Sequence, residues 1–457
     1  MDVEVFVTGG LGDNSYLLMS GDEAAVIDPQ RDAWRFLQAS QARGAVIRAV
    51  LETHVHNDYV SGAHEIRAAT GAQIIAPAKG RYEFPHRPAD EGDEVMLGDL
   101  RLVAMATPGH TFEHISWLVS EGAGPAAVFT GGSLLVGSAG RPDLLGDQHT
   151  GELTRAQHAT LQRLAALPGG VRVLPTHGAG SFCVAAMPTT QRASTIAAER
   201  EENPLLTARD LPEFTTELCS ELMAYPAYYA HMAPVNRAGA PVLGGVPAVP
   251  ALTLPEFRRH ADSGAWIVDA RDRDDFAAGH IPGSVNIELN SGFGSYVGWM
   301  LPFGAPVILV LPDPAEVSLT EAITQLLRIG WSQVPGYLHG GIGAWDGRLR
   351  SYPTASVRDL CDAMVRGDDP LVLDVRQELE WAWGTIPGSR TLFVADLPRQ
   401  IGSIPRDHPV WVICSNGHRA SIAASLLDAA GIQVRLIGAG SVAQCRQHCG
   451  QIPAASR

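Results

Sequence analysis

Cysteine and long apolar runs are both scarce in this sequence. Six cysteines occur in 457 residues: Cys183, Cys219, Cys361, Cys414, Cys445 and Cys449. Their sparse, irregular spacing argues against a disulfide framework and favours the reducing cytoplasm. No run of about 18 apolar residues is present to span a membrane. Residues 1–6 are acidic and alternating, unlike a secretory signal. We therefore expect a cytoplasmic protein with no membrane partner.

Positive charge is also in short supply. Lys79 is the one lysine, and Lys and Arg together number 34 against 49 Asp and Glu, which gives a formal net charge of −15. Binding to a phosphate backbone needs a concentrated basic surface, so we expect no nucleic-acid partner. Apolar residues make up 46% of the chain, enough for large cores. The length predicts about three domains at roughly 150 residues each.

The second half of the chain contains an internal repeat. Residues 267–284 and 372–389 each hold an Asp-x-Arg element, followed at the same interval by Ile-Pro-Gly-Ser. Two apolar runs, 307–311 and 410–414, come next in the same order. We infer two copies of one α/β domain, residues 246–350 and 351–457, after a mixed α/β block at residues 1–245. Residues 225–242 are rich in Pro, Gly and aromatics and are expected to form an arm or linker.

A cysteine stands between a predicted strand and a predicted helix in the C-terminal copy. The β-branched run 410–413 predicts a buried strand, and the apolar stretch 420–430 predicts a helix. Cys414 begins the loop that connects them. Backbone N–H groups of such a loop and the positive end of the helix stabilise a thiolate. Four residues separate Cys414 from Arg419, one fewer than in cysteine-dependent phosphatases, and the smaller ring suits sulfur better than phosphate.

This block resembles the rhodanese (sulfurtransferase) domain in its Asp-x-Arg element, its Ile-Pro-Gly-Ser element and its cysteine loop. The resemblance implies that Cys414 carries a persulfide and that Arg419 supports it. It also implies a substrate pocket formed by the remaining loop residues: Ser415, Asn416, Gly417 and His418.

Two other places invite a chemical interpretation that we do not favour. The first copy has Leu311 where the second has its cysteine, so it cannot carry sulfur and is interpreted as a structural or docking copy. Near the end of the chain, Cys445, His448 and Cys449 lie close together, but no second pair of ligands accompanies them. We expect ordinary tail residues there rather than a metal site.

Three histidine loops follow predicted strands in the N-terminal block. Residues 45–51 are an apolar strand that runs into His54 and His56, with Asp58 close behind. His110 follows the strand at 100–106, and His177 follows the strand at 171–174. Two histidines one residue apart at a strand end can face one metal ion. Core packing does not explain three such loops in one domain, so the pattern predicts a metal site.

The N-terminal block resembles the metallo-β-lactamase fold, especially its glyoxalase-II and persulfide-dioxygenase branches. His-x-His-x-Asp, Thr-Pro-Gly-His-Thr and a late Thr-His-Gly match in order. The whole chain resembles fusions of persulfide dioxygenases with rhodanese domains. The implied fold class is α/β multidomain: a metallo-β-lactamase αββα sandwich followed by two rhodanese-like α/β domains with parallel sheets. The chain departs from the family at Tyr59, where a histidine is usual, and at Gly132, where the family has a metal-ligating aspartate.

These departures shape the expected metal site. We expect His54, His56 and His110 to form a first metal position, while Asp58 and His177 remain as a weak second position. Three imidazoles plus water suit Zn(II), whereas the iron dioxygenases use two histidines and one carboxylate, and Gly132 supplies none. We therefore expect one metal ion, Fe(II) or Zn(II), with Asp58 as a catalytic candidate.

Three hypotheses follow for function. The first is a sulfur-metabolism enzyme in which the metal domain oxidises or processes a small-molecule thiol or persulfide and Cys414 transfers the sulfur. Arg141 is then a candidate for binding the substrate carboxylate. The second is a glyoxalase-II-like thioester hydrolase, and the third a degenerate metal domain that regulates a sulfurtransferase. The first hypothesis requires an accessible Cys414 and converging imidazoles of His54, His56 and His110. The sequence leaves a homo-oligomer open.

Overall fold

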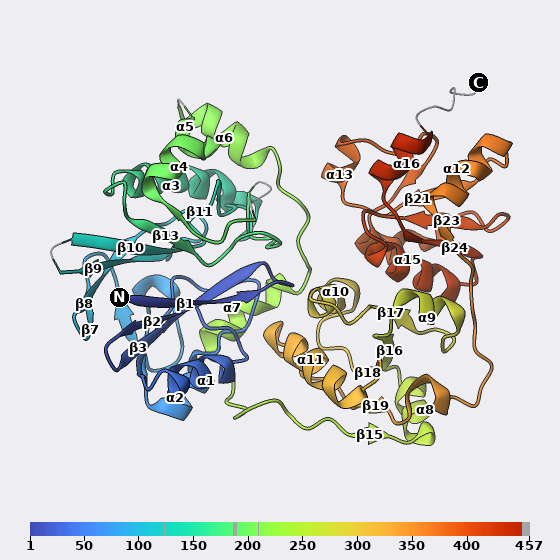
Figure 1. Ribbon diagram of the computed structural model, residues 1–457, viewed down its shortest axis with the longest axis horizontal. Helices are drawn as coiled ribbons and strands as arrows, with labels where there is room; N and C mark the ends of the chain where they lie inside the picture. Colours follow the sequence, from blue (N-terminus) through green and yellow to red (C-terminus); the bar gives the residue numbers. More distant parts are fainter. Residues whose placement is uncertain (123, 186–189, 209, 450–457) are drawn as a thin grey trace. The chain divides into compact units, whose positions relative to one another are not determined.

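A computed structural model describes residues 1–122, 124–185, 190–208 and 210–449 (Figure 1). The contacts divide the chain into two compact units. The first contains Met1–Pro247 and Thr324–Gly330, and the second contains Ala248–Ile323 and Trp331–Arg457. The predicted boundaries after residues 245 and 350 stay predictions. Among the described residues, no helix has both the length and the apolar character that a membrane crossing requires.

Two six-stranded sheets form the centre of the first unit. The first sheet contains β1 (Asp2–Thr8), β2 (Asp13–Ser20), β3 (Glu23–Ile27), β4 (Val46–Leu51), β5 (Gln73–Pro77) and β6 (Arg87–Ala89), in that order. The second contains β14 (Ser194–Thr195), β13 (Arg172–Pro175), β10 (Gly124–Gly131), β9 (Ile115–Glu121), β8 (Leu100–Ala106) and β7 (Glu94–Leu97). One buried apolar cluster takes side chains from both sheets, among them Leu18 and Trp117. The sheets therefore pack face to face.

Helices cover the outer faces of both sheets, as Figure 1 shows. α1 (Trp34–Ala42) and α2 (Ala63–Thr70) share an apolar cluster with the first sheet. The second sheet is covered by α3 (Asp147–Ala165), α4 (Ile196–Glu202), α5 (Pro204–Thr207) and α6 (Leu211–Cys219). Short β11 (Leu134–Leu135), β12 (Ser138–Ala139) and η1 (Ala78–Gly80) complete the two layers. The αββα sandwich predicted from the sequence is confirmed.

Residues 225–242, expected to form an arm or linker, are largely helical. They contain a helix, α7 (Tyr229–Ala238), with Pro234 inside it. Tyr229, Met232 and Asn236 of this helix are buried, a spacing of three, four and seven residues that marks one helical face. The segment therefore packs as part of the first unit, and its proline concealed the periodicity.

The second unit contains two five-stranded parallel sheets with the same strand order. The first is β15 (Ala251–Leu252), β19 (Gly336–Leu338), β18 (Val307–Val310), β16 (Trp266–Asp269) and β17 (Val285–Asn286). The second is β20 (Thr354–Ser356), β24 (Val434–Ala439), β23 (Val410–Ile413), β21 (Leu371–Asp374) and β22 (Arg390–Thr391). The two rhodanese-like domains with parallel sheets are thus confirmed as a fold class.

Helices and short 3-10 turns connect these strands. The first copy has α8 (Leu254–Asp262), α9 (Arg273–Ala278), α10 (Phe293–Met300), α11 (Ala315–Arg328) and η2 (Gly341–Ala344). The second has α12 (Val357–Arg366), α13 (Glu378–Ala382), η3 (Val394–Asp396), α14 (Leu397–Gln400), η4 (Ile401–Ser403), α15 (His418–Ala429) and α16 (Val442–Cys449).

The Asp-x-Arg element of the repeat is a buried ion pair in both copies. Nη2 of Arg271 donates to Oδ2 of Asp269 at 2.6 Å, and Nη2 of Arg376 donates to Oδ2 of Asp374 at 2.7 Å. The same nitrogen also donates 2.8 Å to a backbone carbonyl, that of Gly279 in one copy and of Gly384 in the other. The element therefore ties a strand end to the loop after the following helix, which explains why both copies retain it.

Candidate metal centre and cysteine loop

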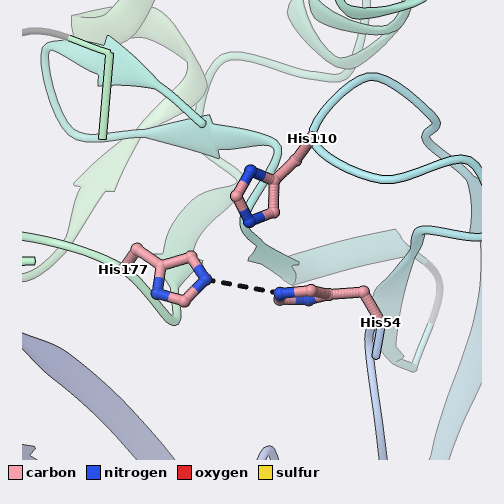
Figure 2. Close-up of side chains that lie close together, drawn as sticks. All are labelled: His54, His110 and His177. Carbon is pink, nitrogen blue, oxygen red and sulfur yellow. Dashed lines mark hydrogen bonds between the residues drawn. The ribbon is translucent and has the colours of Figure 1, made fainter. Parts of the chain in front are cut away.

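Three histidines from loops far apart in the chain meet in the first unit (Figure 2). Nε2 of His54 lies 3.3 Å from Nε2 of His177, and one ring nitrogen of each of His54, His110 and His177 lies within 4.8 Å of the other two. The expected first metal position grouped His56 with His54 and His110. The structure replaces His56 with His177 in that grouping, which we call the histidine triad.

Hydrogen bonds at Nδ1 orient each ring of the histidine triad. Nδ1 of His110 lies 2.9 Å from the carbonyl oxygen of Arg141, which can only accept, so this nitrogen carries the proton. Nδ1 of His54 lies 2.8 Å from Oγ1 of Thr53, whose own proton goes to Asp28. Nδ1 of His177 lies 2.8 Å from Oδ1 of Asp13. Each ring thus presents the lone pair of its Nε2 to the others.

Burial keeps these three rings neutral. Desolvation lowers the pKa of His177, and it lowers the pKa of His54 and His110 well below the ordinary histidine value. Nε2 of His110 has no hydrogen-bond partner among the described residues. Buried lone pairs that face one another without a donor are costly, and a cation removes that cost. The triad therefore fits one divalent metal ion.

His56 lies between two carboxylates. Its Nε2 is 3.3 Å from Oδ1 of Asp28 and 3.2 Å from Oε2 of Glu52. Although burial opposes a charged ring, the negative charges of Asp28 and Glu52 raise the pKa of His56 well above its ordinary value. These two contacts hold the ring of His56 beside the triad. The expected place of His56 in the first metal position stays a prediction.

Two further groupings bring three ligand atoms within 4.8 Å: Asp28 with His54 and His56, and His56 with Asp58 and His177. Both include His56. In the second, Oδ2 of Asp58 lies 3.4 Å from Nδ1 of His177, the nitrogen that also contacts Asp13. Burial raises the pKa of Asp58 to about 7, and the nearby charge of Asp13 adds to this effect. Asp58 thus lies beside the triad rather than within it.

The two positions that depart from the family have physical consequences. Gly132 donates its N–H to Nε2 of His114 at 2.9 Å, and a Cβ at Gly132 would collide with the ring of His110. The place of a side chain at residue 132 is therefore filled by a triad ring. The Tyr59 ring stacks on His56 at 4.3 Å between centroids, and its hydroxyl donates to the carbonyl of Asp28. Neither residue supplies a ligand.

Arg141 has a role in orienting the site. Its carbonyl accepts from His110, and its guanidinium forms a two-point ion pair with Asp143, with both N–O distances 2.7 Å. Nη1 also donates to the carbonyls of Phe182 and Met223. The expectation that Arg141 binds a substrate carboxylate stays a prediction, and this geometry favours a positioning role instead.

Helix α7 and the residue before it supply supports that the sequence did not reveal. Nδ2 of Asn236 donates to the carbonyls of His56 and Tyr59 at 2.9 and 2.8 Å. The hydroxyl of Tyr228 donates to the carbonyl of Asp58 at 3.0 Å. These bonds fix the loop that carries His54 and His56. The helical spacing of the buried residues in 229–236 was the signal that could have indicated this role.

The cysteine loop lies between β23 and α15 in the second unit. Gly417 has the left-handed φ of 90° at the helix N-cap, which directs its N–H back to Sγ of Cys414 at 3.1 Å. Oδ1 of Asn416 accepts from the N–H of His418 at 3.2 Å and lies 3.9 Å from the same sulfur. The loop therefore folds around the sulfur as the sequence suggested, with a backbone donor directed at it.

Cys414 itself has no exposed surface, whereas its neighbours Ser415 and Asn416 are exposed. The expectation of an accessible sulfur is therefore wrong for this closed arrangement. Because Cys414 is buried while Ser415 and Asn416 are exposed, sulfur transfer through Cys414 requires this turn to move.

Arg419 and His418 complete the loop. Nη2 of Arg419 donates to Oε1 of Glu380 at 2.9 Å and to Oγ of Ser415 at 2.7 Å, so Arg419 connects the turn to Glu380. Desolvation, with repulsion by Arg273 and Arg419, lowers the pKa of His418 to about 4. His418 is therefore neutral at physiological pH.

Two further cysteines of the C-terminal copy, Cys361 and Cys445, pack in its core. Sγ of Cys361 lies 3.7 Å from Sγ of Cys445, both buried in one apolar cluster. The side chains of His448 and Cys449 lie outside the described residues, so the expectation of an ordinary tail there stays a prediction.

Two family models match the chain. The metallo-beta-lactamase superfamily matches residues 8–177, and the rhodanese-like domain matches residues 253–348 and 357–444. The chain belongs to the metallo-beta-lactamase superfamily, and two rhodanese-like domains follow its metallo-beta-lactamase domain.

Relatives support this assignment. A hydroxyacylglutathione hydrolase of Methylobacillus flagellatus is 32% identical over 219 residues, 47% of this chain and 82% of that protein. Another, of Cereibacter sphaeroides, is 30% identical over 277 residues, 57% of this chain and 99% of that protein. A crystal structure of a metallo-beta-lactamase from Staphylococcus aureus subsp. aureus COL has a TM-score of 0.67 and 26% identity, covering 74% of this chain and 98% of that one. The combination of domains is that of an enzyme of metal-dependent, sulfur-related chemistry.

Proposed function

We propose that this protein is a sulfurtransferase that carries sulfane sulfur on Cys414 and takes it from a small-molecule thiol carrier. The observation that carries the proposal is the N–H of Gly417 directed at the sulfur of Cys414 at 3.1 Å. The N-terminus of α15 adds positive potential beneath the same loop. Both features stabilise negative charge on the sulfur, which is the state that attacks.

The transfer step can be written from the loop residues. The Cys414 thiolate attacks the outer sulfur of a persulfide carrier, R–S–SH. A bond forms between Sγ and the outer sulfur while the carrier's S–S bond breaks, and the electron pair leaves with the carrier as R–S⁻. The persulfide that remains on Cys414 meets the same backbone donor. A second thiolate accepts the sulfur by the reverse chemistry.

Incubation of the full chain with thiosulfate or glutathione persulfide tests this proposal. Mass spectrometry of the peptide containing Cys414 should show an added sulfur atom, and cyanide should remove it as thiocyanate. Cys414→Ser should abolish both signals, whereas the matched control Cys219→Ser, at a half-buried residue of the first unit, should retain them. Transfer that persists in Cys414→Ser would remove the proposal.

The histidine triad supports a metal-dependent step on the thiol carrier. His54, His110 and His177 would hold one ion, which supplies a Lewis acid for a sulfur or carbonyl group when bound. The chain's own residues fix the rings: Thr53 and Asp13 hold two of them through Nδ1. Three neutral nitrogens without a carboxylate suit Zn(II) better than iron, because iron oxygenases bind their iron through two histidines and one carboxylate.

A thioester hydrolase of the hydroxyacylglutathione hydrolase kind is a weaker second candidate. The relatives of that name favour it. A two-metal hydrolytic site needs a bridging carboxylate, and the ring of His110 lies where a side chain of residue 132 would stand.

Persulfide oxidation is tested directly by oxygen consumption and sulfite formation with iron-loaded protein.

The metal content of variants distinguishes the histidine triad from the first metal position that the sequence predicts, which includes His56 in place of His177. His177→Asn and His110→Asn should lose the metal, whereas His56→Asn should retain one equivalent, although its melting temperature should fall because Asp28 and Glu52 lose their partner. Elemental analysis of folded protein, checked by circular dichroism, measures this. The opposite pattern, with metal lost in His56→Asn and kept in His177→Asn, would restore the first expectation. Absence of metal in the parent chain would favour a degenerate regulatory domain.

A further inference from the structure

The copy without a cysteine sends one side chain to the cysteine loop of the other copy. Nη1 of Arg273, the first residue of α9, donates to the carbonyl oxygen of Asn416 at 2.6 Å and approaches the carbonyl of Gly438 at 3.4 Å. Both acceptors belong to the second copy. The contact therefore joins the two rhodanese-like domains within one compact unit.

One peptide group connects this arginine with the cysteine. The carbonyl of Asn416 and the N–H of Gly417 belong to the same planar peptide unit and point in opposite directions. Arg273 binds the oxygen of this peptide unit, and the N–H of the same unit lies 3.1 Å from Sγ of Cys414. A cation on the carbonyl fixes the direction of the N–H and strengthens it as a donor. Glycine at 417 leaves this peptide free to rotate otherwise.

Arg273 is itself held in place. Nε and Nη2 donate to the two oxygens of Glu288 at 2.8 and 2.6 Å, and the backbone N–H of Arg273 donates to Oε1 at 3.1 Å. In the aligned repeat, Glu378 and Phe393 stand at the corresponding positions of the second copy. The Arg273–Glu288 pair thus belongs to the copy that has Leu311 in place of the cysteine.

Other contacts keep the two copies docked at this place. Asp428 of α15 pairs with Arg350 at 2.7 Å and with His280 at 3.1 Å, both from the first copy. The rings of Tyr296 from α10 and His418 lie 4.5 Å apart. Arg273 is therefore presented to the loop by a surface that several independent contacts fix.

We propose that Arg273 of the first copy is a positioning residue for sulfur transfer at Cys414, acting through the peptide between Asn416 and Gly417. This inference rests on the proposed sulfur transfer at Cys414. It gives the copy without a cysteine a chemical role, because its guanidinium keeps a backbone donor directed at the sulfur while the thiolate or persulfide anion is present.

Alkylation of Cys414 by iodoacetamide across a pH series, followed by mass spectrometry of its peptide, tests this role in the full chain. In Arg273→Ala the alkylation midpoint should move up by about one pH unit, and sulfur transfer at neutral pH should fall about 10-fold and recover at higher pH. Arg273→Lys should restore most of the rate because the charge remains. Glu288→Gln should also raise the alkylation midpoint and lower the rate of sulfur transfer, but by smaller amounts.

Arg258→Ala is the matched control, since Arg258 forms an exposed ion pair with Asp346 in the same copy and lies over Trp345. Profiles of Arg273→Ala and Glu288→Gln that coincide with Arg258→Ala would overturn the inference. A parent chain that never acquires a Cys414 persulfide would instead overturn the proposed function, while a shifted alkylation midpoint in Arg273→Ala would still support the positioning contact.

Discussion

The two rhodanese-like copies have the same strand order and the same buried Asp-x-Arg pair, but they differ in the residues that face the cysteine loop. The second copy has Cys414, and the first has Arg273 and Glu288. The ion pair that both copies have holds the fold, and the residues that differ between them lie at the cysteine loop. The comparison teaches that loss of the cysteine from one copy does not make that copy inert.

The largest effect is expected from the glycine that only the active loop has. Gly417 has a φ of 90°, and a Cβ there would collide with Arg273 and with the carbonyl of Gly438. Gly417→Ala should therefore rotate the peptide away from Cys414 and reduce the rate of sulfur transfer by about 100-fold. Gly431→Ala is the control, because Gly431 has a similar φ of 76° but a Cβ there would meet only Nη1 of Arg406, at 3.9 Å. Equal losses of activity in both variants would show that backbone strain alone is responsible.

The next effect is expected from the Asp-x-Arg ion pair that both copies share, and it concerns the stability of each copy. Asp374→Asn and Asp269→Asn each leave a buried guanidinium without its partner charge and should lower the free energy of unfolding by about 3 kcal/mol. Denaturant melts measure this loss. The transfer rate per folded molecule should stay near that of the parent for Asp269→Asn. A rate that falls more than the folded fraction would give the element a chemical role.

A smaller effect is expected from the ion pair between Glu380 and Arg419 beside the cysteine loop. Burial opposes ionisation of Glu380, but its hydrogen bonds to Arg419 lower the pKa of this carboxyl below its ordinary value of 4.5. A lowered folded-state pKa adds stability that is complete above pH 4.5 and is lost as the pH falls through the folded-state value. Glu380→Gln should therefore cost about 2 kcal/mol at pH 7 and flatten the dependence of stability on acid. A parent and variant whose melts diverge equally at all pH values would contradict this linkage.

The smallest effect is expected from giving the first copy a thiol. Leu311 is followed by Pro312, Asp313 and Pro314, so no N–H from residue 314 can reach the sulfur as Gly417 does. Leu311→Cys in a Cys414→Ser background should acquire no persulfide by mass spectrometry. Uptake of sulfur there would mean that the thiol alone, without the loop, is sufficient.

Much of the fold and part of the site could be predicted from the sequence. Local patterns placed Cys414 at a strand end and His54, His110 and His177 in strand-end loops, because buried strands and turns have short-range signals. The exchange of His56 for His177 in the triad was out of reach. It depends on Asp13, which lies 164 residues before His177 in the chain and orients its ring, and on Asp28 and Glu52, which hold His56. Spacing along the chain does not reveal such partners.

The role proposed for Arg273 was missed for the same reason. It depends on how one copy docks on the other, and the sequence of a single copy does not reveal that surface. Arg273 stands two residues after the Asp-x-Arg arginine in a run of charged residues, a pattern typical of a solvated helix start. Only the position of the Asn416 carbonyl distinguishes it from its neighbours.

The ring of His110 beside Gly132 also determines which substitutions this site accepts. An acidic side chain at residue 132 would meet an occupied volume, so a substitution of Gly132 alone cannot add a carboxylate ligand without displacing the imidazole of His110. Tyr59, which stacks on His56, likewise occupies its place with a ring. A second ion at this place therefore requires at least two coupled substitutions.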